Sequence, residues 1–365
     1  MATGALPWII EGMRVGRPAV TLLLLAGVLL GCAEGDRAEG SGSTTETPSQ
    51  TPSETSGGSE TDDETTYEPT YLEAGDLPRR LSLEEVGART LPARPFADFA
   101  VTAGDGVWLS GVAPGAVRYA ADGTVTARAR IPGEVVQALA ASPGSVWVPS
   151  LNPSALFRLD AATGEVLARV PLPGSPLAEG VVGAAGDRAY VLVDPLEPRI
   201  VVVEGDAVAD EIEAPAGAVA VRAGFGSLWV PTSEHAVERY DFRSQEWTSI
   251  PVGPRPRFLD VGFGAVWVMN QGDGSVSRID PRTGETEQLA MGGVAIGGGD
   301  LTVGGGAVWL RTDSLVIRID PRTRRATHVV APPPGSASAA ATDDFLLISN
   351  HDHNAVHVVG LPLPR

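Results

Sequence analysis

The sequence contains no lysine, a single cysteine and no extended segment in which apolar residues recur at helical spacing. All 27 basic residues are arginines, which we attribute to the coding bias of a GC-rich genome. Because Cys32 stands alone, no disulfide can form within the chain, and the folded part must be stable without one. The lack of helical patterns of ten or more residues indicates an all-β fold.

A basic surface is missing as well, although the formal charge of −18 overstates the acidity of the folded part. Residues 33–76 hold twelve acidic residues and one arginine, a charge of −11, and residues 1–32 contribute +1. Residues 77–365 therefore carry −8 and show no basic stripe. We expect no nucleic acid partner, because binding to phosphates requires clustered cations.

The N-terminus has the pattern of an export signal. Arg14 and Arg17 precede an apolar run of twelve residues, 19–30, which is too short to span a bilayer, since spanning takes about 20 residues. The run ends in Leu29-Leu30-Gly31-Cys32, which resembles the lipobox of bacterial lipoproteins, whose cysteine becomes the lipidated first residue. Leu30 departs from that pattern, where a small or β-branched residue is more usual.

We therefore predict a signal peptide over residues 1–31 and a lipid on Cys32 that holds the protein on the extracytoplasmic face of the cell membrane. The alternatives are a signal peptide with an incidental cysteine and an apolar segment retained as an anchor. Translation from Met13 instead of Met1 would give a more ordinary signal.

Residues 32–76 are predicted to form a disordered tether behind the lipid. Serine, threonine, glycine, glutamate and proline dominate this segment, and it has almost no large apolar side chains. Such a composition cannot bury enough surface to offset the entropy of the chain. A flexible tether of this length has ends separated by about 35–40 Å, which would hold the folded part clear of the membrane.

Residues 77–365 repeat a unit with an aromatic residue near its centre. Successive aromatic positions are 38 to 43 residues apart, a period typical of propeller blades, with a β-solenoid as the alternative. We predict seven blades of four strands and expect the repeated side chains to be core residues: Trp108, Trp147, Tyr190, Trp229, Trp267, Trp309 and, in weaker form, Leu347.

Residues 264–285 show the unit most clearly. Ala265 to Val268 form a short β-rich run around Trp267, and residues 276–280 alternate with the period of a strand. Asp280-Pro281-Arg282-Thr283-Gly284 then turns the chain back: proline sets φ, aspartate caps the backbone and glycine supplies a positive φ.

The last unit ends at Arg365 without an outer strand. Residues 81–92, LSLEEVGARTLP, have no inner or Trp strand of their own and resemble an outer strand that leads into the first unit. We predict that this N-terminal strand completes the seventh blade and closes the ring, which removes open sheet edges. We expect a monomer.

The repeat also separates recurring turns from divergent loops. The glycine-rich turns before the Trp strands and the Asp-Pro-Arg-Thr turns recur closely, and we interpret them as scaffold. The loops after the Trp strands and the connections between blades differ from unit to unit, as expected of a ligand-binding face. The candidate ligand-binding residues on that face are Arg255, Arg257, Asn270, Asp273, His351, Asp352, His353, Asn354, Glu234 and His235. Alternatively, the two arginines pair with neighbouring blades.

The motif VWV followed by SVSRIDPRTGE resembles the seven-bladed propellers of the YVTN/YncE-like group, which are often envelope proteins and lipoproteins. The resemblance covers residues 81–365 and is strongest at Ser145–Glu165, Ala265–Glu285 and Ala307–Arg322. The third unit departs with Tyr190 in place of tryptophan, and the sixth has Arg324 in place of the turn glycine. The resemblance implies a binding module for an envelope protein, peptide or glycan.

Two other functions are considered. The architecture is also similar to that of streptogramin B lyase, a metal-assisted enzyme, which here would have to use Glu234-His235 or the cluster at 351–354. No complete lyase motif is present. His351 and His353, two apart in an extended segment with Asp352 and His357 nearby, would suit a metal ion, whereas a solvated polar loop is the plainer interpretation. We predict no catalytic residues, no metal and no cofactor.

Overall fold

A computed structural model of the chain describes residues 71–72, 77–113, 115–133, 138–177, 179–233, 235–291, 297–335 and 337–364. These residues form strands and turns without a helix, so none of them belongs to a helix that is able to cross a membrane. The described residues belong to one compact unit. The predicted signal peptide, Cys32 and the tether up to residue 70 lie outside the described residues.

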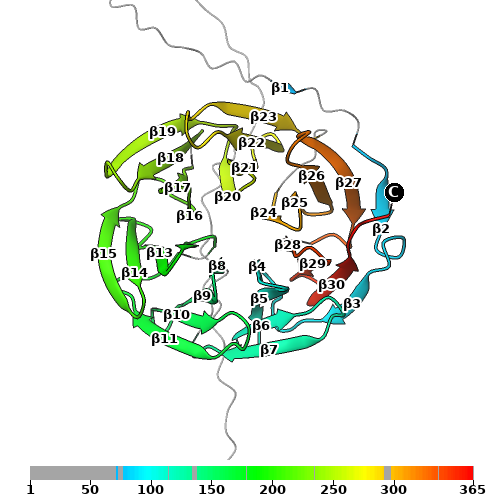
Figure 1. The fold of residues 1–365 in the computed structure, drawn as a ribbon, viewed down its shortest axis with the longest axis horizontal. Helices are drawn as coiled ribbons and strands as arrows, with labels where there is room; N and C mark the ends of the chain where they lie inside the picture. Colours follow the sequence, from blue (N-terminus) through cyan, green and yellow to red (C-terminus); the bar gives the residue numbers. More distant parts are fainter. Residues whose placement is uncertain are drawn as a thin grey trace, which may run out of the picture. The chain divides into compact units, whose positions relative to one another are not determined.

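Seven sheets are arranged in a ring as the blades of a β-propeller, which confirms the predicted fold (Figure 1). Each of the first six blades is built from four consecutive strands, with the first strand innermost. Blade 1 holds β4 (Ala100–Ala103), β5 (Gly106–Val112), β6 (Gly115–Tyr119) and β7 (Val125–Arg130); blade 2 holds β8 (Ala140–Ser142), β9 (Ser145–Ser150), β10 (Ala155–Asp160) and β11 (Val166–Pro171); blade 3 holds β12 (Val182–Ala185), β13 (Arg188–Val193), β14 (Arg199–Glu204) and β15 (Ala207–Glu213). Blade 4 holds β16 (Arg222–Gly224), β17 (Ser227–Pro231), β18 (Ala236–Asp241) and β19 (Glu246–Pro251); blade 5 holds β20 (Pro256–Gly262), β21 (Ala265–Asn270), β22 (Ser275–Ile279) and β23 (Thr286–Ala290); blade 6 holds β24 (Asp300–Gly304), β25 (Ala307–Arg311), β26 (Val316–Asp320) and β27 (Arg325–Ala331).

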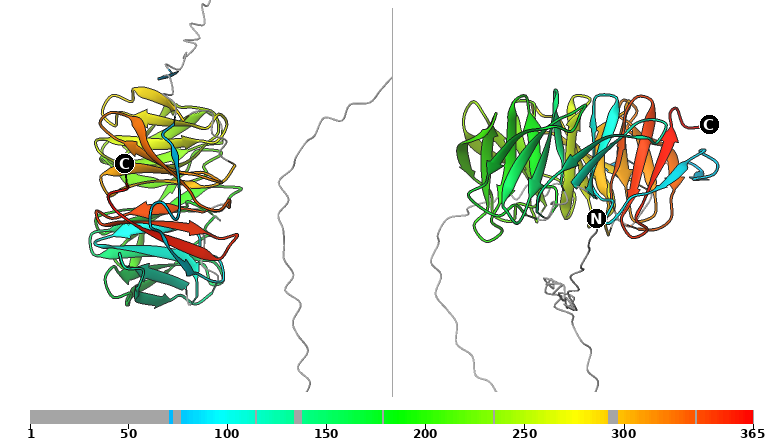
Figure 2. Two further views of the ribbon diagram at one scale, coloured as in Figure 1. Left: turned by 90° about the vertical axis from the view of Figure 1, so that its right-hand side faces the viewer. Right: turned by 90° about the horizontal axis from the view of Figure 1, so that it is seen from below.

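Blade 7 joins the two ends of the described chain. Three of its strands are C-terminal, β28 (Ala339–Ala341), β29 (Phe345–Asn350) and β30 (Ala355–Gly360), and its outer strand is β3 (Arg89–Pro92). β3 runs antiparallel to β30 with Thr90 opposite His357, and Figure 2 shows the N-terminal strands beside the C-terminal ones. The predicted closure of the last blade by an N-terminal strand is therefore confirmed.

Two further strands were not predicted. β2 (Arg80–Ser82) pairs in parallel with β27 of blade 6, and β1 (Tyr71–Leu72), within the segment interpreted as tether, pairs in parallel with β23 of blade 5. Leu81 is buried in the same apolar cluster as Val330, which explains why so short a strand adheres to the blade. The segment that was predicted as one outer strand thus covers the edge of blade 6 before it completes blade 7.

The repeated aromatic residues fill the cores of the blades, as predicted. All seven repeat positions fall on the second strand of their blade, and each side chain is at most 3% exposed. The indole N–H groups of Trp229, Trp267 and Trp309 donate to the carbonyl oxygen five residues earlier, at 2.9–3.1 Å. On the third strand of the same blades, an arginine guanidinium lies over the indole ring, as Arg278 does 5.8 Å from the centre of Trp267.

The Asp-Pro-Arg-Thr turns also have the predicted mechanism. The Asp280 carboxylate accepts backbone N–H groups from Arg282 at 2.8 Å and from Thr283 at 3.4 Å, and these hydrogen bonds lower the pKa of Asp280. Gly284 has a φ of 78°. In blade 6, Arg324 takes the corresponding position with a φ of 59°, so the turn keeps its shape without glycine.

Candidate functional site

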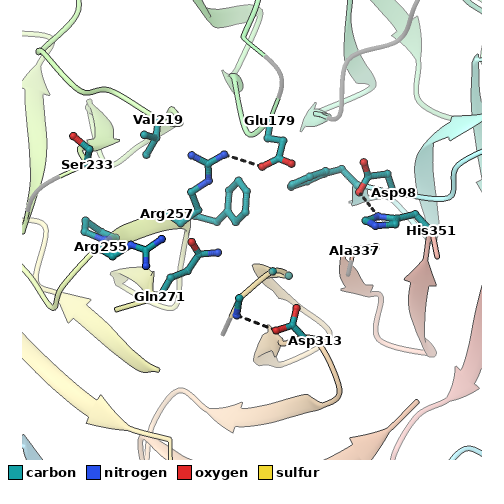
Figure 3. Close-up of a pocket in the computed structure, with 16 residues that line it drawn as sticks. Asp98, Glu179, Val219, Ser233, Arg255, Arg257, Gln271, Asp313, Ala337 and His351 are labelled. Carbon is teal, nitrogen blue, oxygen red and sulfur yellow. Dashed lines mark hydrogen bonds and ion pairs between the residues drawn. The ribbon is translucent and has the colours of Figure 1, made fainter. Parts of the chain in front are cut away.

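A cavity of about 530 Å³, which we call the mouth, lies at the centre of the ring on one of its faces (Figure 3). Consecutive strands alternate in direction, so the connections between blades and the loops after the second strands all emerge on this face. Every blade except blade 2 supplies lining residues, which are Asp98, Phe99, Glu179, Val219, Ser233, Arg255, Pro256, Arg257, Phe258, Gln271, Gly297, Gly298, Gly299, Asp313, Ala337 and His351.

The floor of the mouth is aromatic. Phe99, just before β4, and Phe258, on β20, are buried and meet edge to face with ring centres 5.2 Å apart. Phe99 also lines a second cavity of about 220 Å³ between the inner strands. Both rings therefore line the mouth, and Phe99 lies between the mouth and the second cavity.

Arg257 is held in place by one contact across the mouth and one with the adjacent residue of its own strand. Its guanidinium lies 2.8 Å from the carboxylate of Glu179, which precedes β12 of blade 3, and 5.3 Å from the ring centre of Phe258. Arg257 is thus ion-paired, as the alternative expected, but its partner belongs to blade 3 and not to a blade next to blade 5. An ion pair that is one third exposed adds little stability, but it fixes the orientation of both groups.

Arg255 differs from Arg257 in having no ion pair among the described residues. Its backbone has a φ of 53°, an uncommon conformation for a residue other than glycine, and its carbonyl oxygen accepts the N–H group of Gln271 at 3.0 Å. Figure 3 shows its side chain turned into the mouth beside Gln271. Asp313 of blade 6 adds a carboxylate, which accepts the N–H group of Gly297 at 2.9 Å.

His351 joins blade 7 to the rim of the mouth. Its ring stacks on Phe96 with centres 4.4 Å apart, and its Nε2 atom lies 2.9 Å from the Asp352 carboxylate. Its Nδ1 atom is 3.8 Å from the buried carboxylate of Asp98. Asp98 raises the pKa of His351 although burial of the ring opposes this effect. The mouth therefore combines Asp98, Glu179 and Asp313 with two arginines and a histidine whose pKa is raised.

The structure does not bring all candidate residues to the mouth. Asn270 is fully buried and donates to the hydroxyls of Ser275 and Ser277, because it ends β21 pointing into blade 5. Asp273 is exposed and accepts the N–H group of Ser275, which makes it a turn cap. His235 is exposed and does not line the mouth, and Glu234 lies outside the described residues.

Residues 351–354 form a tight turn, so the expectation of an extended segment with both histidines on one side was wrong. Asn354, with a φ of 49°, donates its N–H group to the carbonyl oxygen of His351. The exposed ring of His353 lies 3.0 Å from the carbonyl oxygen of Pro334, and His357 is buried on β30. In the described part of the chain, no three histidine, cysteine, aspartate or glutamate side chains form a group suited to a metal ion.

Sequence reasoning missed several lining residues, notably Asp98, Phe99, Glu179 and Gln271. Asp98 and Phe99 lie immediately before the inner strand of blade 1, close to the place that Arg257 and Phe258 occupy in blade 5. Aligning the inner strands as well as the tryptophans would have found them. Glu179 lies in a connection whose sequence has no counterpart in the other units, so no pattern marked it.

The sequence matches no known protein family and no curated protein. Among solved structures, the chain is similar to the β-propeller domain of Cps50 (Swd1) from Myceliophteria thermophila, with a TM-score of 0.59 and 10% identity over 75% of this chain and 98% of that one. It also matches BamB from Moraxella catarrhalis, with a TM-score of 0.46 and 14% identity over 71% of this chain and 82% of that one. At these identities the likeness concerns the fold alone. Membership of the YVTN/YncE-like group stays a prediction, and the chain is a seven-bladed β-propeller.

Proposed function

We propose that this protein is a binding module, anchored by a lipid on Cys32 to the extracytoplasmic face of the cell membrane, and that its mouth takes part of an envelope protein, peptide or glycan. The observation that carries the proposal is the convergence of Arg255, Arg257 and His351 with three carboxylates around a cavity of about 530 Å³. Ligand sites combine a concave, partly apolar surface with a few polar groups that fix orientation, and cavities of this volume are typical.

The construction of the mouth supports binding over catalysis. Its lining residues come from the loops and inner strands of six blades, so their spacing is set by the ring of blades and does not depend on a single loop. Charges of both signs surround an apolar floor, which suits a polar ligand with an apolar part. No described arrangement of side chains favours the lyase alternative over this function.

The test replaces Arg255, Arg257 and His351 together by alanine in the full chain. Proteins crosslinked to the wild type in envelope extracts should be lost from the triple variant, because the variant removes two arginines and the histidine that line the mouth. The control replaces Arg130 and Arg169, exposed on the outer strands of blades 1 and 2, by alanine, and should crosslink as the wild type does. Equal crosslinking by all three proteins at matched melting temperature would show that the mouth is not the binding site.

Lipidation at Cys32 and localisation to the membrane are tested separately. Cys32→Ser should abolish incorporation of radiolabelled fatty acid and release the protein from the membrane fraction, or leave the precursor unprocessed. A variant that still carries label in the membrane fraction would refute lipidation at this residue.

A further inference from the structure

The face opposite the mouth carries two phenylalanines in unfavourable turn positions. The two-residue turns between the first and second strands of blades 4, 5 and 6 are Phe225-Gly226, Phe263-Gly264 and Gly305-Gly306. Both residues of each turn have positive φ, and those of Phe225 and Phe263 are 53° and 52°. Asparagine, aspartate and glycine suit such turns, whereas a bulky side chain with positive φ is an outlier.

The rings contribute little to the fold that would compensate for this conformation. Phe225 and Phe263 are 46% and 48% exposed, among the most exposed large apolar residues in the described chain. Blade 6 makes the same turn with two glycines, so the turn itself does not require a ring. Strained, exposed aromatic residues at equivalent positions of adjacent blades point to contact with a partner.

A groove adjoins Phe263. A cavity of about 470 Å³ is lined by this ring together with Gly306 and four further residues of blade 6: Arg318, Asp320, Pro321 and Arg322. The side-chain Oδ1 of Asp320 accepts the N–H groups of Arg322 and Thr323, at 2.8 and 2.9 Å, so this carboxylate is engaged within its own turn. The exposed guanidinium of Arg322 forms no ion pair among the described residues.

Arginines recur in other turns on the same face. Arg243, Arg282 and Arg322 occupy the same place in the turns between the third and fourth strands of blades 4, 5 and 6, and all are exposed. Because consecutive strands are antiparallel, these turns emerge on the same face as Phe225 and Phe263. The only ion pair that the described residues provide to these three guanidinium groups is from Asp280 to Arg282, at 3.7 Å.

We propose that Phe225, Phe263, Arg282 and Arg322 form a second docking surface, the Phe–Arg face, which binds an acidic polypeptide segment that carries an apolar side chain. The apolar side chain lies against Phe263 and Pro321 in the groove, and carboxylates of the segment meet the arginines. Aromatic and arginine residues are the side chains most enriched at the centres of protein interfaces.

The distribution of charge favours a polypeptide over a polyanion such as nucleic acid. Residues 77–365 carry a net charge of −8, and each arginine of the Phe–Arg face follows an aspartate two residues earlier. A long anionic backbone would meet these carboxylates, while a peptide with a few acidic side chains can place them at the arginines alone. The turns that the sequence indicated as scaffold are thus assigned a role in binding.

The test selects peptides from a random dodecapeptide phage library on the full chain. The selected peptides should combine aspartate or glutamate with a large apolar residue, and their affinity should fall as salt rises. Phe225→Asn with Phe263→Asn should weaken binding of the synthetic peptide at least about tenfold. The melting temperature should be unchanged or higher, because asparagine suits positive φ. Arg282→Glu with Arg322→Glu should weaken binding to a similar degree.

Two controls distinguish the Phe–Arg face from the rest of the protein surface. Leu196→Asn removes an apolar side chain that is 95% exposed in the loop between β13 and β14, on the side of the mouth, and should leave peptide binding unchanged. The triple alanine variant of the mouth should bind the peptide as the wild type does. The peptide assay can therefore refute the Phe–Arg face without bearing on the function proposed for the mouth. Enrichment of basic peptides, absence of enrichment, or equal affinity for the Phe225→Asn/Phe263→Asn variant would overturn the proposal.

Discussion

Replacing Asp300 with asparagine should remove a loss of folding stability that the wild type suffers as pH rises. Asp300 begins the inner strand β24 and is 1% exposed; it accepts the hydroxyl of Ser338 at 2.6 Å and the N–H group of Leu301 at 2.8 Å. Burial raises the pKa of Asp300 from 3.8 to about 7, and the nearby charges of Arg222 and Asp260 act in opposite directions. The folded state therefore favours the neutral carboxylic acid, and ionisation of Asp300 destabilises the fold.

The sign and size follow from proton linkage. Between the unfolded pKa of 3.8 and the folded pKa of about 7, the folded state binds more protons, so stability falls as pH rises and the loss is complete above about 7. At about 1.4 kcal/mol for each pH unit, the ionised residue destabilises the fold by roughly 4 kcal/mol at pH 8. Only about 3 kcal/mol of that loss should appear between pH 5 and pH 8.

The assay is urea unfolding of wild type and Asp300→Asn at pH 5, 6, 7 and 8, followed by the fluorescence of the buried tryptophans. The difference between the two proteins at each pH cancels other titrating groups. Between pH 5 and pH 8, the free energy of unfolding of the variant relative to that of the wild type should rise by about 3 kcal/mol. The exposed turn variant Asp343→Asn serves as the control and should show no such gain. A difference independent of pH, or a variant less stable than wild type at pH 8, would refute the reasoning.

Three further predictions concern the ring. Removing residues 1–92 should lower the melting temperature more than removing residues 1–76, because only the longer deletion takes the outer strand of blade 7 and the strand that covers blade 6; equal melting temperatures would contradict the closure. Trp267→Ala should reduce the free energy of unfolding by about 3–5 kcal/mol in urea titrations, since the indole is fully buried, whereas Trp267→Phe should cost less. Burial lowers the pKa of His357 from 6.5 to about 4, so the folded state binds this proton less readily than the unfolded state and loses stability as pH falls from 6.5 to 4. His357→Gln removes this loss and should unfold at a lower pH than the wild type in an acid titration.

The sequence predicted the ring because the signals of a repeat add up. Seven aromatic positions at one period, and turns such as Asp280 to Gly284 with a clear backbone mechanism, determine strands and blades whatever the loops contain. The site was less accessible because a loop residue's direction depends on single hydrogen bonds. Asn270 and Gln271 are adjacent, yet Asn270 is sealed inside blade 5 by two serine hydroxyls while Gln271 faces the mouth. No property of the residue types distinguishes them.

The strands at the edges of the blades were also difficult to predict from the sequence. Leu81 and Leu91 occur in one short segment that was interpreted as a single strand, but they belong to strands on different blades. The turn at Glu84 to Gly87 separates them, with the Gly87 N–H group bonded to the carbonyl oxygen of Glu84 at 2.9 Å. Three-residue strands such as β2 are stabilised by the blade they join, so their own sequence contains little to predict them.

Backbone conformation ties the two proposed surfaces to one physical argument. Seven residues other than glycine have positive φ in the described chain. Gln245 and Arg324 occupy the glycine position of a repeated turn, and Asp194 and Asn354 are residue types that tolerate this conformation. The remaining three are Arg255, Phe225 and Phe263; the two phenylalanines also stand where blade 6 has a glycine, and none of the three is a residue type that favours positive φ. Each presents a side chain to a surface proposed for binding, Arg255 at the mouth and the phenylalanines opposite. Residues held in sparsely populated conformations persist where the surrounding structure enforces them, often at sites of binding, which agrees with the two proposed surfaces.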